Sequence, residues 1–264
     1  MIVSLHPDLL PRRAWALVQR WLLAWWRIID LGAVVLVLLC TPSSYRRAAR
    51  IRLARQIYTD TVPILPGFTV LAALLSLVIT HIVVVTALSY GLTRYALEMV
   101  IRVLVLELIP LTAALFIAMR TTIPGAAELA RLRSAGALQA LRAQGGDPVR
   151  MEFLPRVLAG AYASVTLAAL SCVVALLMAY LGVYGLTSAG VPAYTRMFGQ
   201  VFTPSITLVF ALKTLLFSLA VALIPMAGSL HPAQRQPDGA QGGLARLFAV
   251  LLLIELVSLL GNYY

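Results

Sequence analysis

The sequence predicts an all-α membrane protein with five membrane-spanning helices. Of its 264 residues, 61% are hydrophobic and 12% are charged, and the mean hydropathy is +0.92. Soluble domains carry about a quarter charged residues, and a soluble fold of this size has too much surface to cover with so few polar groups. Residues 61–93 and 157–195 contain no Asp, Glu, Lys or Arg. Lipid is therefore the expected solvent for most of the chain.

The five expected spans are apolar runs separated by polar or Pro/Gly-containing segments. They lie at residues 61–93, 95–119, 157–195, 204–227 and 244–261. A helix crosses the hydrocarbon core with about 17 to 25 residues, and each run reaches that length. The sequence thus predicts a multi-pass membrane protein.

The arginines predict how these spans are oriented. Of 21 basic residues all but one are Arg, nine of them up to Arg55 and six from Arg120 to Arg156, both ends included. Cytoplasmic loops carry an excess of Lys and Arg, so we expect a cytoplasmic N-terminus and a periplasmic C-terminus. Because the arginines alternate with apolar runs and do not share one polar face, no nucleic-acid partner is expected.

Residues 13–40 are apolar but broken by charges. Arg20, Arg27 and Asp30 interrupt the run, and Trp15, Trp21, Trp25 and Trp26 crowd its first half. Because Trp prefers the headgroup region, we expect a helix lying in the membrane interface, with partial entry into the membrane as the alternative. The expected organisation is one domain over 1–264, with 1–60 cytoplasmic or interfacial and 61–264 forming the five-span core.

A polar helix is expected at about 125–143, in the long cytoplasmic loop between the second and third spans. It begins after Pro124 and stops at Gly145-Gly146, and Asp147 then precedes Pro148 as a helix cap does. The charged residues of this helix are Glu128, Arg131, Arg133 and Arg142, and Asp147 follows as the cap of the next helix. From the residues alone, the polar helix could equally lie on anionic lipid with its arginines at the headgroups.

Three charged residues lie at similar depth inside predicted spans, where charges are costly and mark functional candidates. Glu107, Lys213 and Glu255 each lie roughly 12–18 Å below the outer surface at about 1.5 Å per residue. Because consecutive antiparallel helices are often neighbours, we predict that Lys213 pairs with Glu255. Glu107 is then left to face something else.

Several motifs, in order along the chain, resemble one transporter family. Residues 106–120 read LELIPLTAALFIAMR, followed by AAELARLR at 126–133, DPVRMEFLPR at 147–156 and ALKTLLF at 211–217. The residues that match the family pattern, with no gap in the alignment, are Glu107, Pro110, Arg120, Ala127, Glu128, Leu129, Arg133, Asp147, Pro148, Arg150, Pro155 and Arg156. The pattern resembles the MlaE/YrbE family, the permease subunits of MCE-associated phospholipid ABC transporters that act in outer-membrane lipid asymmetry, from about residue 46 to the end.

The resemblance implies a function and partners. It implies a permease that moves phospholipid, or a similar lipid, between the inner membrane and a periplasmic MCE-domain protein. It further implies a second permease subunit, identical or different, and a cytoplasmic ABC ATPase that holds ATP and Mg. The helix at 125–143 would be the coupling helix that docks on the ATPase. Glu107 would lie near a lipid cavity at the dimer axis, which we predict is also lined by Ile79, Thr86 and Tyr90 of the first span.

The chain itself shows no catalytic motif. It contains no GxxxxGK[ST] phosphate-binding loop, no HExxH and no GxSxG. We therefore expect no catalytic residue, no metal ligand and no cofactor in this chain. Ile109, Met119 and Ala130 stand where the family pattern has glycine, so a non-transporting or heteromeric partner of another permease is the alternative. An intramembrane lipid enzyme is a more remote one.

Overall fold

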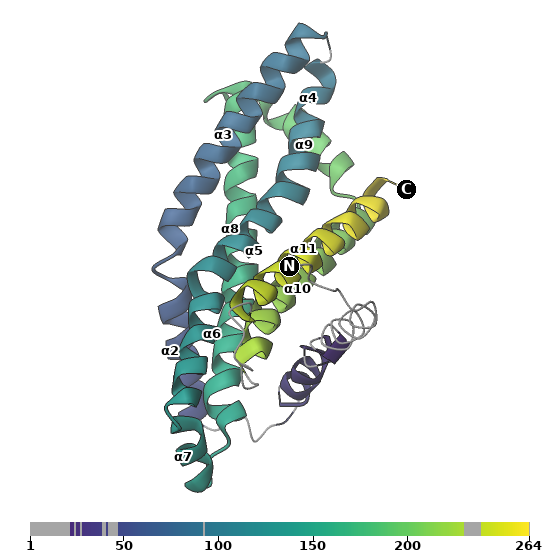
Figure 1. The fold of residues 1–264 in the computed structure, drawn as a ribbon. Helices are drawn as coiled ribbons and strands as arrows, with labels where there is room; N and C mark the ends of the chain where they lie inside the picture. Colours follow the sequence, from purple (N-terminus) through teal and green to yellow (C-terminus); the bar gives the residue numbers. More distant parts are fainter. Residues whose placement is uncertain are drawn as a thin grey trace, which may run out of the picture.

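We describe the protein from a computed structural model, which covers residues 22, 23, 25, 26, 28–38, 41, 47–91, 93–229 and 239–263. In the described residues all regular secondary structure is helical (Figure 1). Five helical stretches are long and apolar enough to cross a membrane: Arg50–Ser89, Leu97–Ser134, Val149–Tyr184, Pro204–Ser229 and Gly243–Asn262. The prediction of an all-helical chain with five candidate spans is therefore confirmed.

The first span is entered through a proline-marked break. Helix α2 (Arg47–Thr61) ends just before Pro63, and α3 (Leu65–Ser89) begins with Pro66 in its first turn. A proline costs no hydrogen bond in a first turn, so the chain bends between the two helices without interrupting either. Helix α3 has 25 residues and is about 37 Å long at 1.5 Å per residue, enough to cross a bilayer with some tilt.

Wider π-helical turns precede three prolines. The second span runs through α4 (Thr93–Val100), η2 (Ile101–Leu108), α5 (Ile109–Ile117), η3 (Ala118–Thr122) and α6 (Ile123–Ser134). The third begins with η4 (Val149–Phe153) and continues as α8 (Leu154–Tyr184). Pro110, Pro124 and Pro155 lie second in the α-helix that follows each π segment. A proline ring clashes with the carbonyl four residues earlier, and a widened turn relieves that clash without ending the span.

Two predicted helices differ from the structure at glycines. The polar helix expected at 125–143 is two helices, α6 and α7 (Ala137–Ala143), because Gly136 takes a left-handed φ of 76° between them. The third span, expected at 157–195, ends at Tyr184, because Gly185 has φ 67°. A short turn, η5 (Ser188–Gly190), and α9 (Val191–Val201) follow it. Glycine adopts these positive φ values without steric cost.

Helix α8 lies at the centre of the packing. It contacts α2, α3, α5 and α10 (Pro204–Ser229), and α10 also packs along α11 (Gly239–Tyr263) (Figure 1). Small residues allow the closest approaches, as is common between membrane helices. A Cβ built on Gly160 would lie 2.7 Å from Thr122 Cγ2, and one on Gly182 would lie 2.8 Å from Thr80 Cγ2. Neither glycine therefore has room for a side chain.

The N-terminal segment packs on the core in its described part. The helix Ile28–Leu38 is apolar but too short to span. Leu31, Val35 and Leu38 are buried with residues of α6, α8 and α10, while Trp26 is exposed. Trp15 and Trp21 lie outside the described residues, so the interfacial placement of this segment stays a prediction.

Candidate functional site

Lys213 of α10 anchors a buried polar cluster within the spans. Its side chain is 1% exposed, and its Nζ lies 2.8 Å from Glu255 Oε2 on α11, the partner that the sequence predicts. The same ammonium also binds the carboxylate of Glu107, the second-last residue of η2. The ammonium donates a further hydrogen bond to the Leu106 carbonyl at 3.2 Å. Three spans are thus joined at one cation.

Glu107 differs from its predicted environment. The sequence analysis left it free to face a cavity, but in the structure it is 8% exposed and one carboxylate oxygen binds Lys213. Its other oxygen accepts a hydrogen bond of 3.0 Å from Asn262 Nδ2. The sequence predicted equal depth for Glu107, Lys213 and Glu255, which is compatible with this three-way arrangement. It was not predicted, because only helices consecutive in the sequence were expected to be neighbours.

Asn262 is a functional candidate that the sequence analysis did not single out. It lies on α11 seven residues after Glu255, with Ser258 between them, and Ser258 is 5% exposed. Spacings of three and seven residues put all three on one helical face. That polar stripe on an otherwise apolar helix was the available signal.

The stripe of Ile79, Thr86 and Tyr90 is not gathered with Glu107 within the chain. Ile79 and Thr86 lie on α3 and Tyr90 follows its last residue; α3 packs mainly on α8 and α4, whereas Glu107 packs toward α10 and α11. Ile79 is half-buried, Thr86 donates to the Ile82 carbonyl at 2.7 Å, and Tyr90 is 76% exposed. Their role in lining a lipid cavity stays a prediction.

The five coupling candidates gather at the end of the molecule formed by α6, α7 and η4, which we call the arginine-rich end. Glu128 forms an ion pair of 3.8 Å with Arg131, and both are exposed. Arg133 donates to the Ser229 carbonyl of α10 at 3.3 Å and, with Arg142, lines a cavity of about 140 Å³. Asp147 caps η4 by accepting from Val149 N at 3.0 Å. Arg133 thus ties the arginine-rich end to α10.

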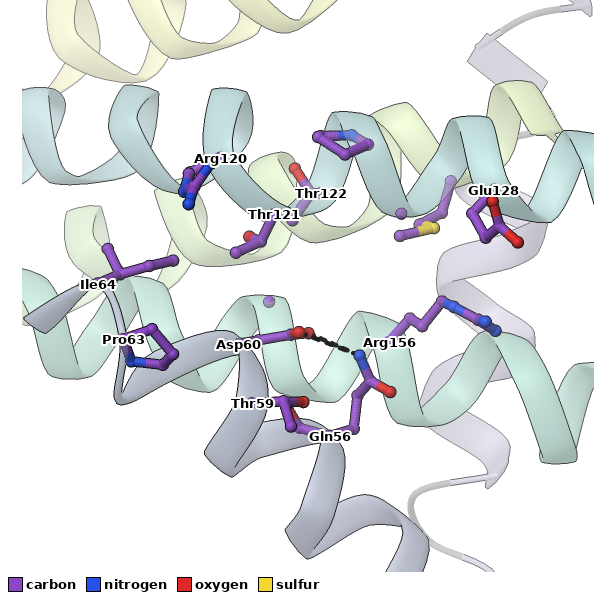
Figure 2. A pocket seen from close by; sticks show the side chains of 14 residues that line it. Gln56, Thr59, Asp60, Pro63, Ile64, Arg120, Thr121, Thr122, Glu128 and Arg156 are labelled. Carbon is purple, nitrogen blue, oxygen red and sulfur yellow. Dashed lines mark hydrogen bonds between the residues drawn. The ribbon is translucent and has the colours of Figure 1, made fainter.

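A larger polar cavity, of about 460 Å³, lies between α2, η3–α6 and α8 (Figure 2). Arg120 and Glu128 project from the η3–α6 wall, and Gln56, Asp60 and Arg156 from the opposite walls. Arg156 is paired with Glu152, one turn earlier on the same chain segment. Arg120 and Arg156 both belong to the motifs that resemble the MlaE/YrbE family, but the sequence did not predict that they share a cavity.

Comparison with protein-family models matches residues 53–260 to the model described as permease MlaE. The chain belongs to the MlaE permease family. It is therefore a multi-pass membrane protein and the membrane subunit of an ABC-type transporter. A search of curated proteins finds no match.

The region matched to the MlaE family contains every site described above except Asn262. It begins within α2 and ends near the end of α11, so both the buried Lys213 cluster and the polar cavity belong to the family part of the chain. The helix Ile28–Leu38 precedes it. The MlaE match agrees with the resemblance drawn from the motifs at 106–156 and 211–217.

Proposed function

We propose that this chain is the permease subunit of a transporter that moves phospholipid, or a similar lipid, between the inner membrane and a periplasmic MCE-domain protein. The observation that carries the proposal is the MlaE permease match over residues 53–260. A separate ATPase subunit supplies the energy, with ATP and Mg bound on that subunit. Outer-membrane lipid asymmetry is the process in which such transport acts.

The arginine-rich end is the proposed docking site for the ATPase. A permease needs a rigid element that transmits ATPase closure to its spans. Helices α6 and α7 form a projecting tip, as Figure 1 shows, whose charged side chains include the exposed pair Glu128 and Arg131. Because α6 continues the second span and Arg133 binds the last turn of α10, force on the tip reaches two spans directly.

The buried cluster is the proposed rigid connection between spans. Lys213 binds carboxylates from the second and fifth spans, so it makes three spans move together. In the dimer that we propose, Ile79, Thr86 and Tyr90 face a lipid cavity formed with the second permease subunit, whereas Glu107 stays bound to Lys213. Tyr90 is 76% exposed in the single chain, which leaves it available to a partner or a lipid.

The test is reconstitution with the ATPase and MCE-domain proteins encoded for the same transporter. We expect ATP-dependent transfer of labelled phospholipid between liposomes and the MCE-domain protein. Arg131→Glu should reduce ATPase association at least tenfold, whereas Arg196→Glu, on α9, is the matched control and should not. Nucleotide-independent transfer, or no association of the ATPase with the intact chain, would refute the proposal.

A heteromeric partner of another permease is the second candidate. Met119, which stands where the family pattern has glycine, is 70% exposed, so a neighbouring subunit meets a long side chain in place of a flat surface. Co-expression with and without a second permease separates the candidates. Assembly of this chain alone into an active complex favours the homodimer.

A further inference from the structure

The 460 Å³ cavity lies where the ends of three candidate spans meet. Asp60 lies just before the first span's apolar helix α3, Arg120 follows α5 at the end of the second span's apolar part, and Arg156 opens α8. Three span ends therefore meet here, on the side where the arginines predict the cytoplasm. The cavity is separate from the Lys213 cluster, with which it shares no lining residue.

Two opposite charges in this cavity form no ion pair among the described residues. Asp60 accepts from Gln56 Nε2 at 2.9 and 3.1 Å, and Arg156 attracts its carboxylate without coming within ion-pair distance. Arg120, from η3, likewise makes no ion pair in the described part of the chain. The other two charged residues that line the cavity already form ion pairs, Arg156 with Glu152 and Glu128 with Arg131. Figure 2 shows Arg120 and Asp60 extending from opposite walls.

An exposed apolar stripe runs from this cavity along the first span. Ile64 lines the cavity, and Leu71, Leu74 and Val78 follow it on α3 at spacings of seven, three and four residues, which lie on one helical face. Those three side chains are 51%, 58% and 52% exposed. Between them and Ile64, Gly67 leaves open space where a side chain would stand. Ile64 itself is buried, so Leu71, Leu74 and Val78 offer acyl chains an exposed apolar surface on the helix that begins at the cavity.

We propose that this cavity binds the headgroup of a zwitterionic phospholipid from the cytoplasmic leaflet, with the phosphate at Arg120 and the ammonium at Asp60. Arginine binds phosphate through parallel N–H bonds, and Asp60 accepts from the amine. A purely anionic headgroup would meet the Asp60 carboxylate, and a purely cationic ligand would meet Arg120. A headgroup that carries both charges satisfies both walls.

This inference rests on the proposed function in taking the ligand to be a membrane lipid that the transporter handles. It adds a binding site on the arginine-rich side, distinct from the proposed cavity at Tyr90. The same phosphodiester-and-amine chemistry occurs in soluble glycerophosphoethanolamine, so the experiment needs an arm for each source.

The test is native mass spectrometry of the full chain released from nanodiscs that contain equal phosphatidylethanolamine and phosphatidylglycerol. The wild type is expected to retain phosphatidylethanolamine in preference. Because a hydrogen bond to a charged group is worth tenfold or more in affinity, Arg120→Gln should lower retention of both lipids about tenfold. Asp60→Asn should remove the preference, because it lowers phosphatidylethanolamine retention and no longer repels phosphatidylglycerol.

Matched variants keep this test independent of folding. Arg120→Lys retains the cation and should restore retention of both lipids in part. Arg52→Gln removes an exposed arginine of α2 that does not line the cavity and should behave as wild type. Thermal unfolding in detergent identifies any variant that fails to fold, and the Lys and Asn variants then decide.

The outcomes separate this site from the proposed function. Unchanged lipid retention in both Arg120→Gln and Asp60→Asn would overturn the site. Displacement of the lipid by glycerophosphoethanolamine at an equal concentration would overturn a membrane source. Selective retention in a chain whose complex transfers no lipid on ATP hydrolysis supports the site while the proposed function fails. Normal ATP-driven transfer with no selectivity would remove the site alone.

Discussion

The ammonium of Lys213 binds the carboxylate of Glu107, which lies 106 residues earlier in the chain and on a different span. Glu255 binds the same ammonium at 2.8 Å. Two carboxylates therefore share one buried cation, and the cluster carries a net charge of −1 when all three are ionised. In a low-dielectric interior each carboxylate is stabilised by the ammonium and repelled by the other carboxylate, so both depend on Lys213.

Lys213→Met should destabilise the fold strongly, because it leaves two carboxylates buried without a cation. Breaking a buried pair costs about 3–5 kcal/mol, which we expect to see as a lower thermal-unfolding midpoint in detergent. The triple variant with Glu107→Gln and Glu255→Gln should recover most of the loss. Leu212→Met, on an exposed face of the same helix, is the control. An unaltered midpoint for Lys213→Met would show that the cluster does not stabilise the chain.

Asn262→Ala should lower stability by a smaller amount. Its Nδ2 donates 3.0 Å to Glu107 Oε1, and a hydrogen bond to a charged group contributes about 1.5–3 kcal/mol. The loss should disappear when Glu107 is already Gln, because the acceptor is then uncharged. A double-mutant cycle on the unfolding midpoints measures this coupling, and additive effects would contradict it. Leu260→Ala, on an exposed position of α11, serves as the reference.

Gly160→Ala should separate α8 from η3. The new Cβ would lie 2.7 Å from Thr122 Cγ2, closer than van der Waals contact allows, and overpacking costs about 1–3 kcal/mol. Thr122→Ser removes the opposing methyl and should restore part of the loss. At Gly199, with nothing within 4 Å, the same change should be neutral or stabilising by up to about 1 kcal/mol. Equal effects at the two glycines would exclude a packing cause.

Tyr194 should make stability depend on pH only in strongly alkaline solution. Its hydroxyl donates to the Leu176 carbonyl at 2.8 Å, holding α9 on α8, and burial raises the pKa of Tyr194 to about 12. A pKa raised above the unfolded value of about 10 means full stabilisation below pH 10 and loss as pH rises toward 12. Unfolding midpoints of wild type and Tyr194→Phe should therefore differ below pH 10 and converge above it. A constant difference across this range would contradict the assignment.

The five spans could be predicted because lipid imposes a simple rule on local sequence. A run without charges, such as 157–195, must either cross the membrane or hide from water. The rule does not locate ends within an apolar run, so the stop at Gly185 was missed. Hydropathy does not show which glycine adopts a positive φ. The division of the polar helix at Gly136 was missed for the same reason.

Parts of the candidate site could be predicted in the same way. Lys213 and Glu255 lie on consecutive helices at similar depth, which made their pairing predictable. Glu107 and Asn262 could not be joined to them, because their contact depends on how the second span packs against the fourth and fifth. The cavity with Asp60 and Arg120 lies between segments 60 residues apart, and no local pattern brings them together.

The sequence by itself determined that this chain is helical, crosses a membrane with five apolar segments and places its arginines on one side. These properties follow from the composition of short segments and from the cost of charge in lipid. Only the tertiary structure decided which buried charges meet, that Lys213 serves two carboxylates, and that Asp60 and Arg120 face one another across a cavity. Such relationships depend on side-chain packing between distant helices, where small residues such as Gly160 set how closely the helices approach.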